Sequence, residues 1–308
     1  MSKLVSVLMS TYKEPIEYIE QSITSILSQT YKNLEFIIII DDPTNEKIIS
    51  CVQRYAYIDS RIKVYINKTN LGLVASLNCG ISYCNGEFIA RMDADDISKP
   101  KRIELQLHFL NDNNLDLVGT AIHELREIQK TSYDIYYPES SRLCEIQLKS
   151  GSSSPHPTWL AKREVFLKLN GYRNISFCED YDFLIRAVEA GFSLGNIQNI
   201  LLYYRIRENS ISTSNSFKQR AIAEFLGSMY RNNIHLSMEM YYDYIMSNDY
   251  SLDTAFFRKC SEKEQNIKEA NPSRYLNILE LLFNFKYLNI KLRHKRFNYV
   301  KWIEVTNR

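Results

Sequence analysis

Short apolar runs alternate with amphipathic stretches from residue 4 to about residue 205. The runs at 4–9, 34–40 and 88–92 carry few polar residues, which is typical of strands buried on both faces. After Pro15, apolar residues instead recur at helical spacing as far as Leu27. Strands and helices that alternate in this way predict a doubly wound, mostly parallel α/β sheet, which is a Rossmann-like arrangement.

The same pattern predicts the remaining elements. Further strands are expected at 62–66, 115–119 and 199–205, and further helices at 46–55, 74–84, 101–110, 163–169 and 181–190. A loop rich in Ser and Pro is expected at 150–157. Beyond residue 217 the pattern is helical throughout, and no glycine follows Gly227. We therefore place a boundary near Ser214, between an α/β domain (1–214) and a C-terminal helical region (215–308).

Composition excludes several classes of protein. With 45% apolar and 24% charged residues, the chain of 308 residues has the make-up of a soluble globular protein. A net charge of +2 is too small to suggest binding to nucleic acid. The six cysteines form no CxxC pair, so buried thiols in a reducing cytosol are expected. We expect no signal peptide, and no apolar run approaches the roughly 20 residues that span a bilayer.

The most distinctive stretch is the acidic turn after the third of these apolar runs. Asp93, Asp95 and Asp96 lie within four positions, and such crowding of negative charge is unfavourable unless a cation neutralises it. From a turn at the end of a strand, Asp93 and Asp95 could both bind one Mg²⁺ or Mn²⁺ ion. The alternative is a solvated acidic turn in which Asp96 or Ser98 caps the next helix.

Polar groups also follow the first two strands. Ser10, Thr11 and Tyr12 end one strand, Asp41 and Asp42 end the next, and such strand ends converge on one crevice in an open sheet. Tyr12 could stack on a nucleotide base while Asp42 accepts a hydrogen bond from it. The alternatives are that Ser10 and Thr11 only cap the helix that begins at Pro15, and that Asp41 and Asp42 only cap the next helix. The sequence contains no GxGxxG turn and no P-loop.

Several short motifs follow one another in a known order. They comprise 5–12, 25–31, Asp41 with Asp42, 70–72, Leu77 with Asn78, 86–96, Pro100 with Arg102, Gly171 with Tyr172, and 179–182. In this combination they resemble the family 2 glycosyltransferases with the GT-A fold, and most closely the bacterial branch that makes capsular polysaccharide and exopolysaccharide. The resemblance covers about residues 3–212.

The resemblance implies a role for individual residues. Ser10, Tyr12 and Asp42 match positions that hold the nucleoside of the donor, usually a uridine. Asp95 matches the carboxylate that binds Mn²⁺ or Mg²⁺, and Asp93 matches its partner near the ribose and the metal. Three further residues are expected in the nucleotide-binding site, namely Thr11, Glu14 and Asn70.

The resemblance also implies a catalytic pair. Asp180 matches the general base of inverting members, and Glu179 would support it. A base is needed because the acceptor hydroxyl loses its proton as it attacks the anomeric carbon. The alternative use of both carboxylates is to stabilise the positive end of the helix that follows.

The sequence departs from the family pattern at three places. Lys13 stands where many relatives have Asn, and Leu77 lies where many have an Arg that contacts the diphosphate. Arg207 occupies the position of a His that is often the third metal ligand, which puts tight metal binding in doubt. Lys13, Arg91 or Arg207 could supply the charge for the diphosphate, and a guanidinium matches phosphate oxygens well.

Two aromatic side chains are candidates for the acceptor side. His156 lies in the segment where the family loop reaches toward donor phosphate or acceptor, and it could equally be a surface residue. Trp159 could stack on a sugar, although packing in the core is its more common use.

The C-terminal region ends in basic and aromatic residues. The basic ones are Lys286, Lys291, Arg293, Lys295, Arg296 and Lys301, interleaved with Tyr287, Phe297, Tyr299 and Trp302. Such helices suit an anionic membrane surface, and the alternatives are a solvated face or a contact between subunits.

Together with the resemblance, these observations predict an inverting, metal-dependent enzyme that moves a hexose from a UDP-sugar to a saccharide in surface polysaccharide synthesis. The acceptor is expected to be lipid-linked. The enzyme would be cytoplasmic, at the inner face of the cell membrane. Two alternatives stay open. One is a sugar-1-phosphate nucleotidyltransferase, which should carry a Gly-rich first loop, and the other is a non-catalytic subunit that binds nucleotide or glycan.

Overall fold

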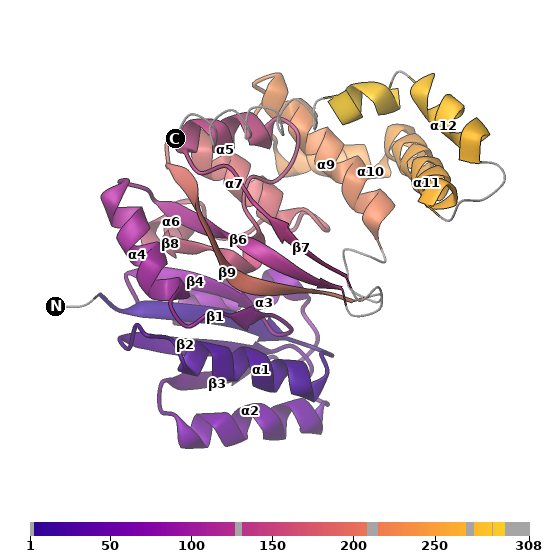
Figure 1. Cartoon of the computed structure of the whole chain (residues 1–308). Helices are drawn as coiled ribbons and strands as arrows, with labels where there is room; N and C mark the ends of the chain where they lie inside the picture. The colour runs from indigo at the N-terminus through magenta and orange to yellow at the C-terminus, as the bar shows by residue number, and fades with distance from the viewer. Residues whose placement is uncertain (1–2, 127–130, 208–214, 269–273, 285, 293–308) are drawn as a thin grey trace. The chain divides into compact units, whose positions relative to one another are not determined.

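A computed structural model describes residues 3–126, 131–207, 215–268, 274–284 and 286–292 (Figure 1). The chain forms two compact units. Unit 1 comprises Met1–Cys144, Ser153–Asn174 and Asp182–Arg207, and unit 2 comprises Glu145–Ser152, Ile175–Tyr181 and Glu208–Arg308. The boundary expected near Ser214 lies outside the described residues. The two short segments of unit 2 that interrupt unit 1 have no counterpart in the sequence pattern.

Unit 1 is built on one mixed sheet. Its strands are β1 (Val5–Thr11), β2 (Leu34–Ile40), β3 (Ile62–Ile66), β4 (Phe88–Asp93), β5 (Ile97–Ser98), β6 (Leu117–Arg126), β7 (Thr131–Ile135), β8 (Leu160–Lys162) and β9 (Leu194–Ile206). They lie in the order β3-β2-β1-β4-β8-β6-β9-β5, and β7 pairs with β6.

The first four strands of that order are parallel, as the apolar runs predict. The antiparallel pairs involve β5, β7 and β8, none of which the sequence pattern predicts. These strands are short or polar, so they carry little hydrophobic periodicity. β9 begins five residues before the expected strand and runs parallel to β6 through an irregular register.

Helices cover both faces of the parallel part. The large core cluster joins alternate strand residues such as Val7 and Phe36 to α1 (Ile16–Leu27), α2 (Glu46–Ile58) and α4 (Arg102–Asp112). On the other face, α3 (Leu73–Tyr83) lies so close to the sheet that a Cβ on Gly80 would meet the side chains of Leu8 and Ile39. Covering both faces explains why β2 is buried at every position.

Two further elements complete unit 1, apart from the helices it shares with unit 2. They are η1 (His156–Thr158) and α6 (Arg163–Lys168), which lie on either side of β8 in the sequence. The expected loop at 150–157 therefore ends in a helical turn. α5 (Ser141–Leu148) and α7 (Glu179–Glu189) each have residues in both units.

The helices α9 (Ser216–Arg231), α10 (Met238–Met246), α11 (Asn248–Lys268) and α12 (Arg274–Leu282) belong to unit 2. Helix α9 packs on α11 through Ala221 and Phe257. The two short segments 145–152 and 175–181 join them through hydrogen bonds to Tyr241, Gln219 and Arg231. The helical character expected of the C-terminal region is confirmed for its described part.

Two expectations about covalent chemistry and membranes can be tested directly. All six cysteines are free thiols, and five of them are buried. Within the described ranges, no helix combines the length and the apolar character needed to cross a membrane.

Glu35 ties together the ends of three segments at the start of the parallel sheet. Its carboxylate accepts hydrogen bonds from Ser6 Oγ (2.6 Å), Lys63 Nζ (2.6 Å) and Asn85 N (2.7 Å). Burial alone would raise the pKa of Glu35, but these hydrogen bonds outweigh burial and lower the pKa to about 2. The ionised carboxylate therefore stabilises the fold above its ordinary pKa.

We expect Glu35→Gln to lower the free energy of unfolding at pH 7 by up to about 3 kcal/mol. Because the folded-state pKa lies below the ordinary value of 4.5, wild type should lose this stability as the pH falls from about 4.5 to about 2. The variant should lose less over that range. Urea unfolding at several pH values measures this, with the exposed Glu17→Gln as control. Parallel pH profiles for the variant and wild type would contradict the prediction.

Candidate active site

The register of the sheet brings two of the three polar strand ends side by side. Ser10 on β1 lies opposite Asp93 on β4, and Ile39 on β2 lies on its other side. Asp41 follows directly after β2 and donates its backbone N–H to the Thr11 carbonyl (2.8 Å). The expected convergence of the polar groups at this edge of the sheet is therefore observed.

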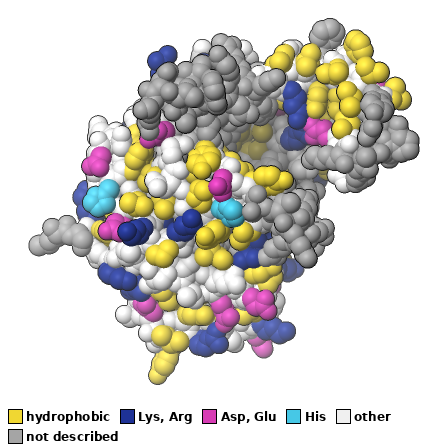
Figure 2. All heavy atoms as spheres, in the orientation of Figure 1, with side chains coloured by type: hydrophobic (Ala, Val, Ile, Leu, Met, Phe, Trp, Pro, Cys, Tyr) yellow, Lys and Arg dark blue, Asp and Glu magenta, His cyan; other side chains and the backbone are white. Residues whose placement is uncertain are grey.

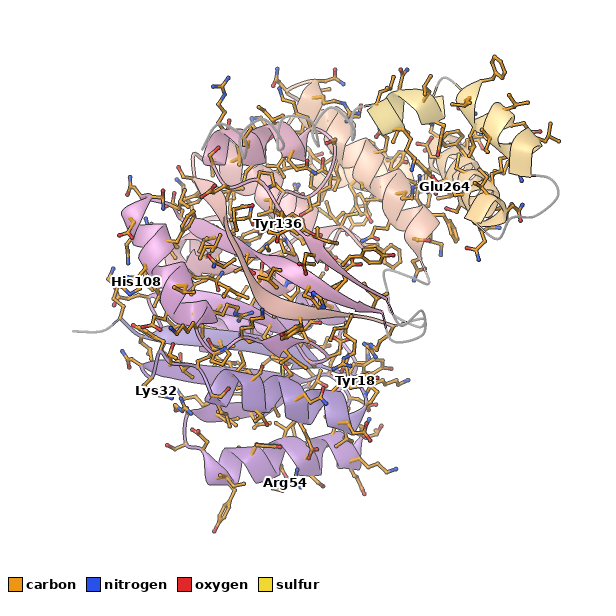
Figure 3. All side chains as sticks on the ribbon, in the orientation of Figure 1. Tyr18, Lys32, Arg54, His108, Tyr136 and Glu264 are labelled. Carbon is orange, nitrogen blue, oxygen red and sulfur yellow. The ribbon has the colours of Figure 1, made fainter. Side chains whose placement is uncertain are left out.

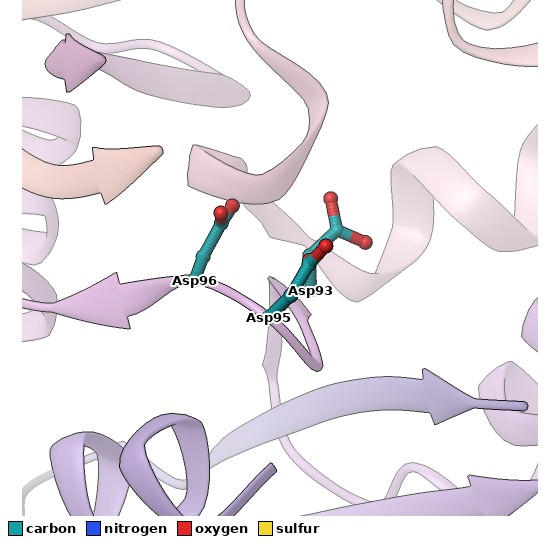
Figure 4. A group of neighbouring side chains, drawn as sticks. All are labelled: Asp93, Asp95 and Asp96. Carbon is teal, nitrogen blue, oxygen red and sulfur yellow. The ribbon is translucent and has the colours of Figure 1, made fainter. Parts of the chain in front are cut away.

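The acidic turn forms a compact group of carboxylates. One oxygen each of Asp93, Asp95 and Asp96 lies within 4.8 Å of the others, and all three side chains rise from the same turn (Figure 4). Asp96 is buried and accepts the N–H of Arg205 (2.9 Å). Neither Asp96 nor Ser98 caps α4, whose N-cap, Lys101, makes no side-chain cap. The helix-cap alternative for this turn is wrong.

The electrostatics of the group favour a bound cation. Burial, with the neighbouring Asp93 carboxylate, raises the pKa of Asp95 to about 6, although Arg207 opposes the rise. The same two causes raise the pKa of Asp96 well above its ordinary value. Oδ2 of Asp96 is buried without a hydrogen-bond partner among the described residues. Carboxylate oxygens crowded in this way fit a hard divalent cation, for which the half-exposed Asp93 and Asp95 are the accessible ligands.

Asp93 and Asp95 each form an ion pair with an arginine. Arg91, on β4 itself, is buried and contacts Asp93 at 2.5 Å. Arg207 contacts Asp95 at 2.6 Å through Nη2. Arg91 is therefore unsuited to the diphosphate role considered for it. Lys13 is exposed and lies over the Tyr12 ring, so it stays a candidate with Arg207.

Arg205 holds the turn in place, a role that the sequence pattern does not indicate. Its Nε donates to the Asp95 carbonyl (2.9 Å) and its Nη2 to Gln21 Oε1 (2.7 Å). The guanidinium lies 3.9 Å from the centre of the Tyr18 ring, which projects from α1 (Figure 3). β9 and α1 thereby clamp the acidic turn from two directions. The only hint of this role in the sequence is that Arg205 lies two residues before Arg207.

Glu14 organises the loop after β1. One carboxylate oxygen accepts Thr11 Oγ1 (2.8 Å) and the N–H of Tyr12 (2.7 Å). Neither Ser10 nor Thr11 caps α1, whose N-cap, Pro15, makes no side-chain cap. Tyr12 is 37% exposed and is therefore accessible to a base.

The two carboxylates after β2 have different uses. Asp41 is buried and accepts hydrogen bonds from Asn67 Nδ2 (2.7 Å) and from the N–H groups of Leu71 (2.8 Å) and Gly72 (2.9 Å). It thereby holds the loop that carries the exposed Asn70. Asp42 instead accepts from its neighbour Thr44, which lowers its pKa.

Helix capping is the wrong explanation for both carboxylates, because Asn45 caps α2. Asp42 and Asn70 thus stay available to a nucleotide in the part of the chain that the structure describes.

Another matching motif also proves structural. Asn78 donates to the Tyr172 carbonyl (2.9 Å) and accepts its N–H (2.8 Å). A Cβ on Gly171 would lie 2.4 Å from Asn78 Oδ1, and Gly171 has a φ of 68°, so glycine is required there. The pairing of Leu77-Asn78 with Gly171-Tyr172 therefore joins α3 to the loop after α6.

The acceptor-side candidates lie in the core. Trp159 has no exposed surface and packs against Tyr172 and Phe183, so the alternative of sugar stacking is wrong. His156 is also buried, with Nε2 2.8 Å from the Tyr172 hydroxyl, and burial lowers its pKa well below the ordinary value. Neither the surface position nor the ligand contact considered for His156 fits this burial.

Glu179 and Asp180 form the first turn of α7 and are half-buried. They belong to unit 2, whereas the acidic turn belongs to unit 1. Two residues on, Asp182 is buried between Arg186 (2.8 Å from Nε) and Arg173. Asp182 is thus a structural carboxylate, and the role of Asp180 as base stays a prediction.

Comparisons with known proteins agree with this architecture. The chain is 32% identical over 242 residues to the O-antigen biosynthesis glycosyltransferase WbnJ of Escherichia coli, covering 74% of this chain and 94% of that one. Two solved structures share the fold. They are TarS 1–349 of S. aureus in complex with UDP-GlcNAc (TM-score 0.59, 17% identity, 80% of this chain and 75% of that one) and the mannosyltransferase PcManGT of Pyrobaculum calidifontis with GDP-Man and Mn²⁺ (TM-score 0.59, 15% identity, 94% and 84%).

These two neighbours identify the sheet of unit 1 as a GT-A fold, as the resemblance implied. The model of the family described as Glycosyl transferase family 2 matches residues 6–186, which contain nearly all of β1, the acidic turn and the start of α7. The chain therefore belongs to glycosyltransferase family 2.

Proposed function

We propose that this glycosyltransferase moves a hexose from a UDP-sugar to a saccharide acceptor, with inversion at the anomeric carbon, during synthesis of a bacterial surface polysaccharide. The observation that carries the proposal is the group formed by Asp93, Asp95 and Asp96 beside Ser10 at the carboxyl ends of the parallel strands. This is the edge at which open α/β sheets bind their ligands. Of the relatives, WbnJ is named for O-antigen biosynthesis.

The choice of donor rests on the loops around the acidic turn. TarS was solved with UDP-GlcNAc and PcManGT with GDP-Man, so the fold accepts either nucleotide. Tyr12 offers an exposed ring for stacking, and the Asp42 carboxylate can accept an N–H of a uracil. Both residues match positions that hold uridine in the family, which favours UDP here.

Asp95 and Asp93 would hold a Mn²⁺ or Mg²⁺ ion, and the neighbour PcManGT was solved with Mn²⁺. Such an ion, when bound, acts as a Lewis acid that stabilises the negative charge of the leaving diphosphate. Arg205 keeps the turn in position by its bonds to the Asp95 carbonyl and to Gln21. Glu14 holds the loop that carries Tyr12.

Asp180 would be the general base, with Glu179 in support. A carboxylate accepts the proton of the attacking acceptor hydroxyl, and the hydroxyl oxygen then bonds to the anomeric carbon as the bond to the diphosphate breaks. The support for this role is the match to the family motif and a place in the first turn of α7, where the helix dipole favours an ionised carboxylate.

The alternative of a sugar-1-phosphate nucleotidyltransferase is wrong, because residues 6–186 match the model of the family Glycosyl transferase family 2. A non-catalytic subunit would bind UDP without turning over a UDP-sugar. A panel of UDP- and GDP-sugars, tested for hydrolysis with and without Mn²⁺, distinguishes that subunit from the proposed enzyme.

A lipid-linked acceptor would place the enzyme at the inner face of the membrane, and unit 2 offers one surface for this. Exposed apolar residues gather over α12 (Figure 2), namely Leu276, Leu279, Leu282 and Phe283. Of the basic residues expected to meet lipid, Lys286 pairs with Asp253 and Lys291 with Glu264 (2.9 Å). The other four lie outside the described residues. The apolar face of α12 therefore supports the proposal better than the two lysines do.

We expect Asp95→Asn to reduce Mn²⁺-dependent UDP binding and to lower hydrolysis of the UDP-sugar by about a hundredfold or more, because the ion would lose a charged ligand. Calorimetry and a donor-hydrolysis assay measure the two effects. Asp112→Asn, at the exposed end of α4, serves as the control. Wild-type binding and turnover in Asp95→Asn would refute the metal role.

Asp180→Asn should spare UDP binding and lower turnover by about a hundredfold, since the amide cannot accept the proton. Single-turnover transfer and UDP calorimetry separate these two quantities. Glu164→Gln, an exposed change on α6, should alter neither. Equal losses of binding and turnover in Asp180→Asn would indicate a structural role instead.

For the membrane, we expect the double variant Leu276→Asp with Leu279→Asp to bind anionic vesicles at least about tenfold more weakly than wild type, because two charges would enter the apolar face. Flotation with phosphatidylglycerol vesicles measures binding, and UDP-sugar hydrolysis should stay unchanged. Leu167→Asp, similarly exposed on α6, is the control. Equal flotation of wild type and the double variant would rule out α12 as the contact.

A further inference from the structure

The ion pair between Arg207 and Asp95 occupies a carboxylate oxygen that the proposed metal site would need as a ligand. Arg207 Nη2 lies 2.6 Å from Asp95 Oδ2 and 3.9 Å from Glu14 Oε1. The guanidinium therefore joins the acidic turn to the loop after β1. Arg91 makes the corresponding contact with Asp93, so each of the two carboxylates proposed for the metal is paired with one arginine.

Arg207 differs from the other two arginines at the turn in what holds it. Arg91 is 2% exposed and lies within β4, so its position is part of the core. Arg205 lies within β9 and binds the backbone of the turn as well as Gln21. Arg207 lies one residue beyond the end of β9, and its side chain is 27% exposed. Of the three, Arg207 is therefore the arginine that lies outside the strands and keeps a partly exposed side chain.

A guanidinium and a divalent cation cannot both take the same carboxylate oxygen at close range, because their charges repel. If Asp95 binds the metal, Arg207 must give up at least part of this contact. Its planar N–H groups match phosphate oxygens, which the donor would bring to the same edge of the sheet.

We propose that Arg207 competes with the divalent cation for Asp95 and, when the donor arrives, exchanges Asp95 for a diphosphate oxygen. Metal and donor would therefore bind with positive coupling, since the donor removes the competitor of the metal. This inference rests on the proposed function, and it assigns to Arg207 a positioning role in place of the metal-binding His of other family members.

The test is a titration with Mn²⁺ alone, followed by electron paramagnetic resonance of the free ion, in the full-length chain. Arg207→Gln should bind Mn²⁺ about tenfold more tightly than wild type, because the competing charge is gone. Arg207→Lys, which keeps a cation within reach, should stay close to wild type. Addition of UDP should tighten Mn²⁺ binding several-fold more in wild type than in Arg207→Gln.

The control is Arg61→Gln, which removes a similarly buried guanidinium from its ion pair with Asp59 and should leave Mn²⁺ affinity unchanged. Asp95→Asn identifies the site, because it should abolish binding in every background. Equal or weaker Mn²⁺ affinity in Arg207→Gln, with binding still lost in Asp95→Asn, would overturn the competition but leave the metal site intact. Absence of Mn²⁺ binding in all variants, with and without UDP, would overturn the metal role as well.

Discussion

The crowding of three carboxylates at the end of β4 is the constraint on which the rest of unit 1 depends. Like charges this close destabilise a partly buried site unless positive groups neutralise them. Three arginines supply this positive charge. Arg91 contacts Asp93 from β4, Arg205 binds the backbone of the turn, and Arg207 contacts Asp95 from beyond the end of β9. The antiparallel pairing of β9 with β5 brings this end of β9 beside the turn. The same crowding of negative charge is what supports the proposal of a divalent cation there.

A second layer of polar ties keeps the strand ends in position. Asp41 holds the loop at 67–72, Asn78 holds the segment at Gly171, and Gln29 donates to the Lys99 carbonyl (2.9 Å) just after β5. All of these belong to the motifs that carry the family resemblance. Their buried hydrogen bonds explain them without any contact to substrate. The motifs therefore mix residues that would meet the donor with residues that only position the loops.

Unit 2 shows how charge can be used for packing as well as for recognition. Glu264, labelled in Figure 3, accepts hydrogen bonds from Lys291 (2.9 Å) and Tyr287 (3.0 Å), and an ion pair with Arg220 joins it to α9. Part of the basic character of this region is thus neutralised within the unit. The apolar face of α12 is among the surfaces that the described helices leave exposed, and the proposed membrane role rests on that face.

The sequence by itself determined the parallel strands, the helices α1 to α4, the polar strand ends and the acidic turn. Each of these is a local pattern of hydrophobic periodicity or of charge. It also indicated the family, because the order of its motifs is specific to that family. Only the tertiary structure showed that Asp41, Asp96 and Asp182 are buried among their partners, whereas Asp42, Asp95 and Asp180 stay partly exposed. The same holds for Trp159 and His156, whose burial depends on residues distant in sequence, and for β5, β7 and β8. Those strands are too short or too polar to carry a periodic signal, and they form because β4, β6 and β9 offer edges to pair with.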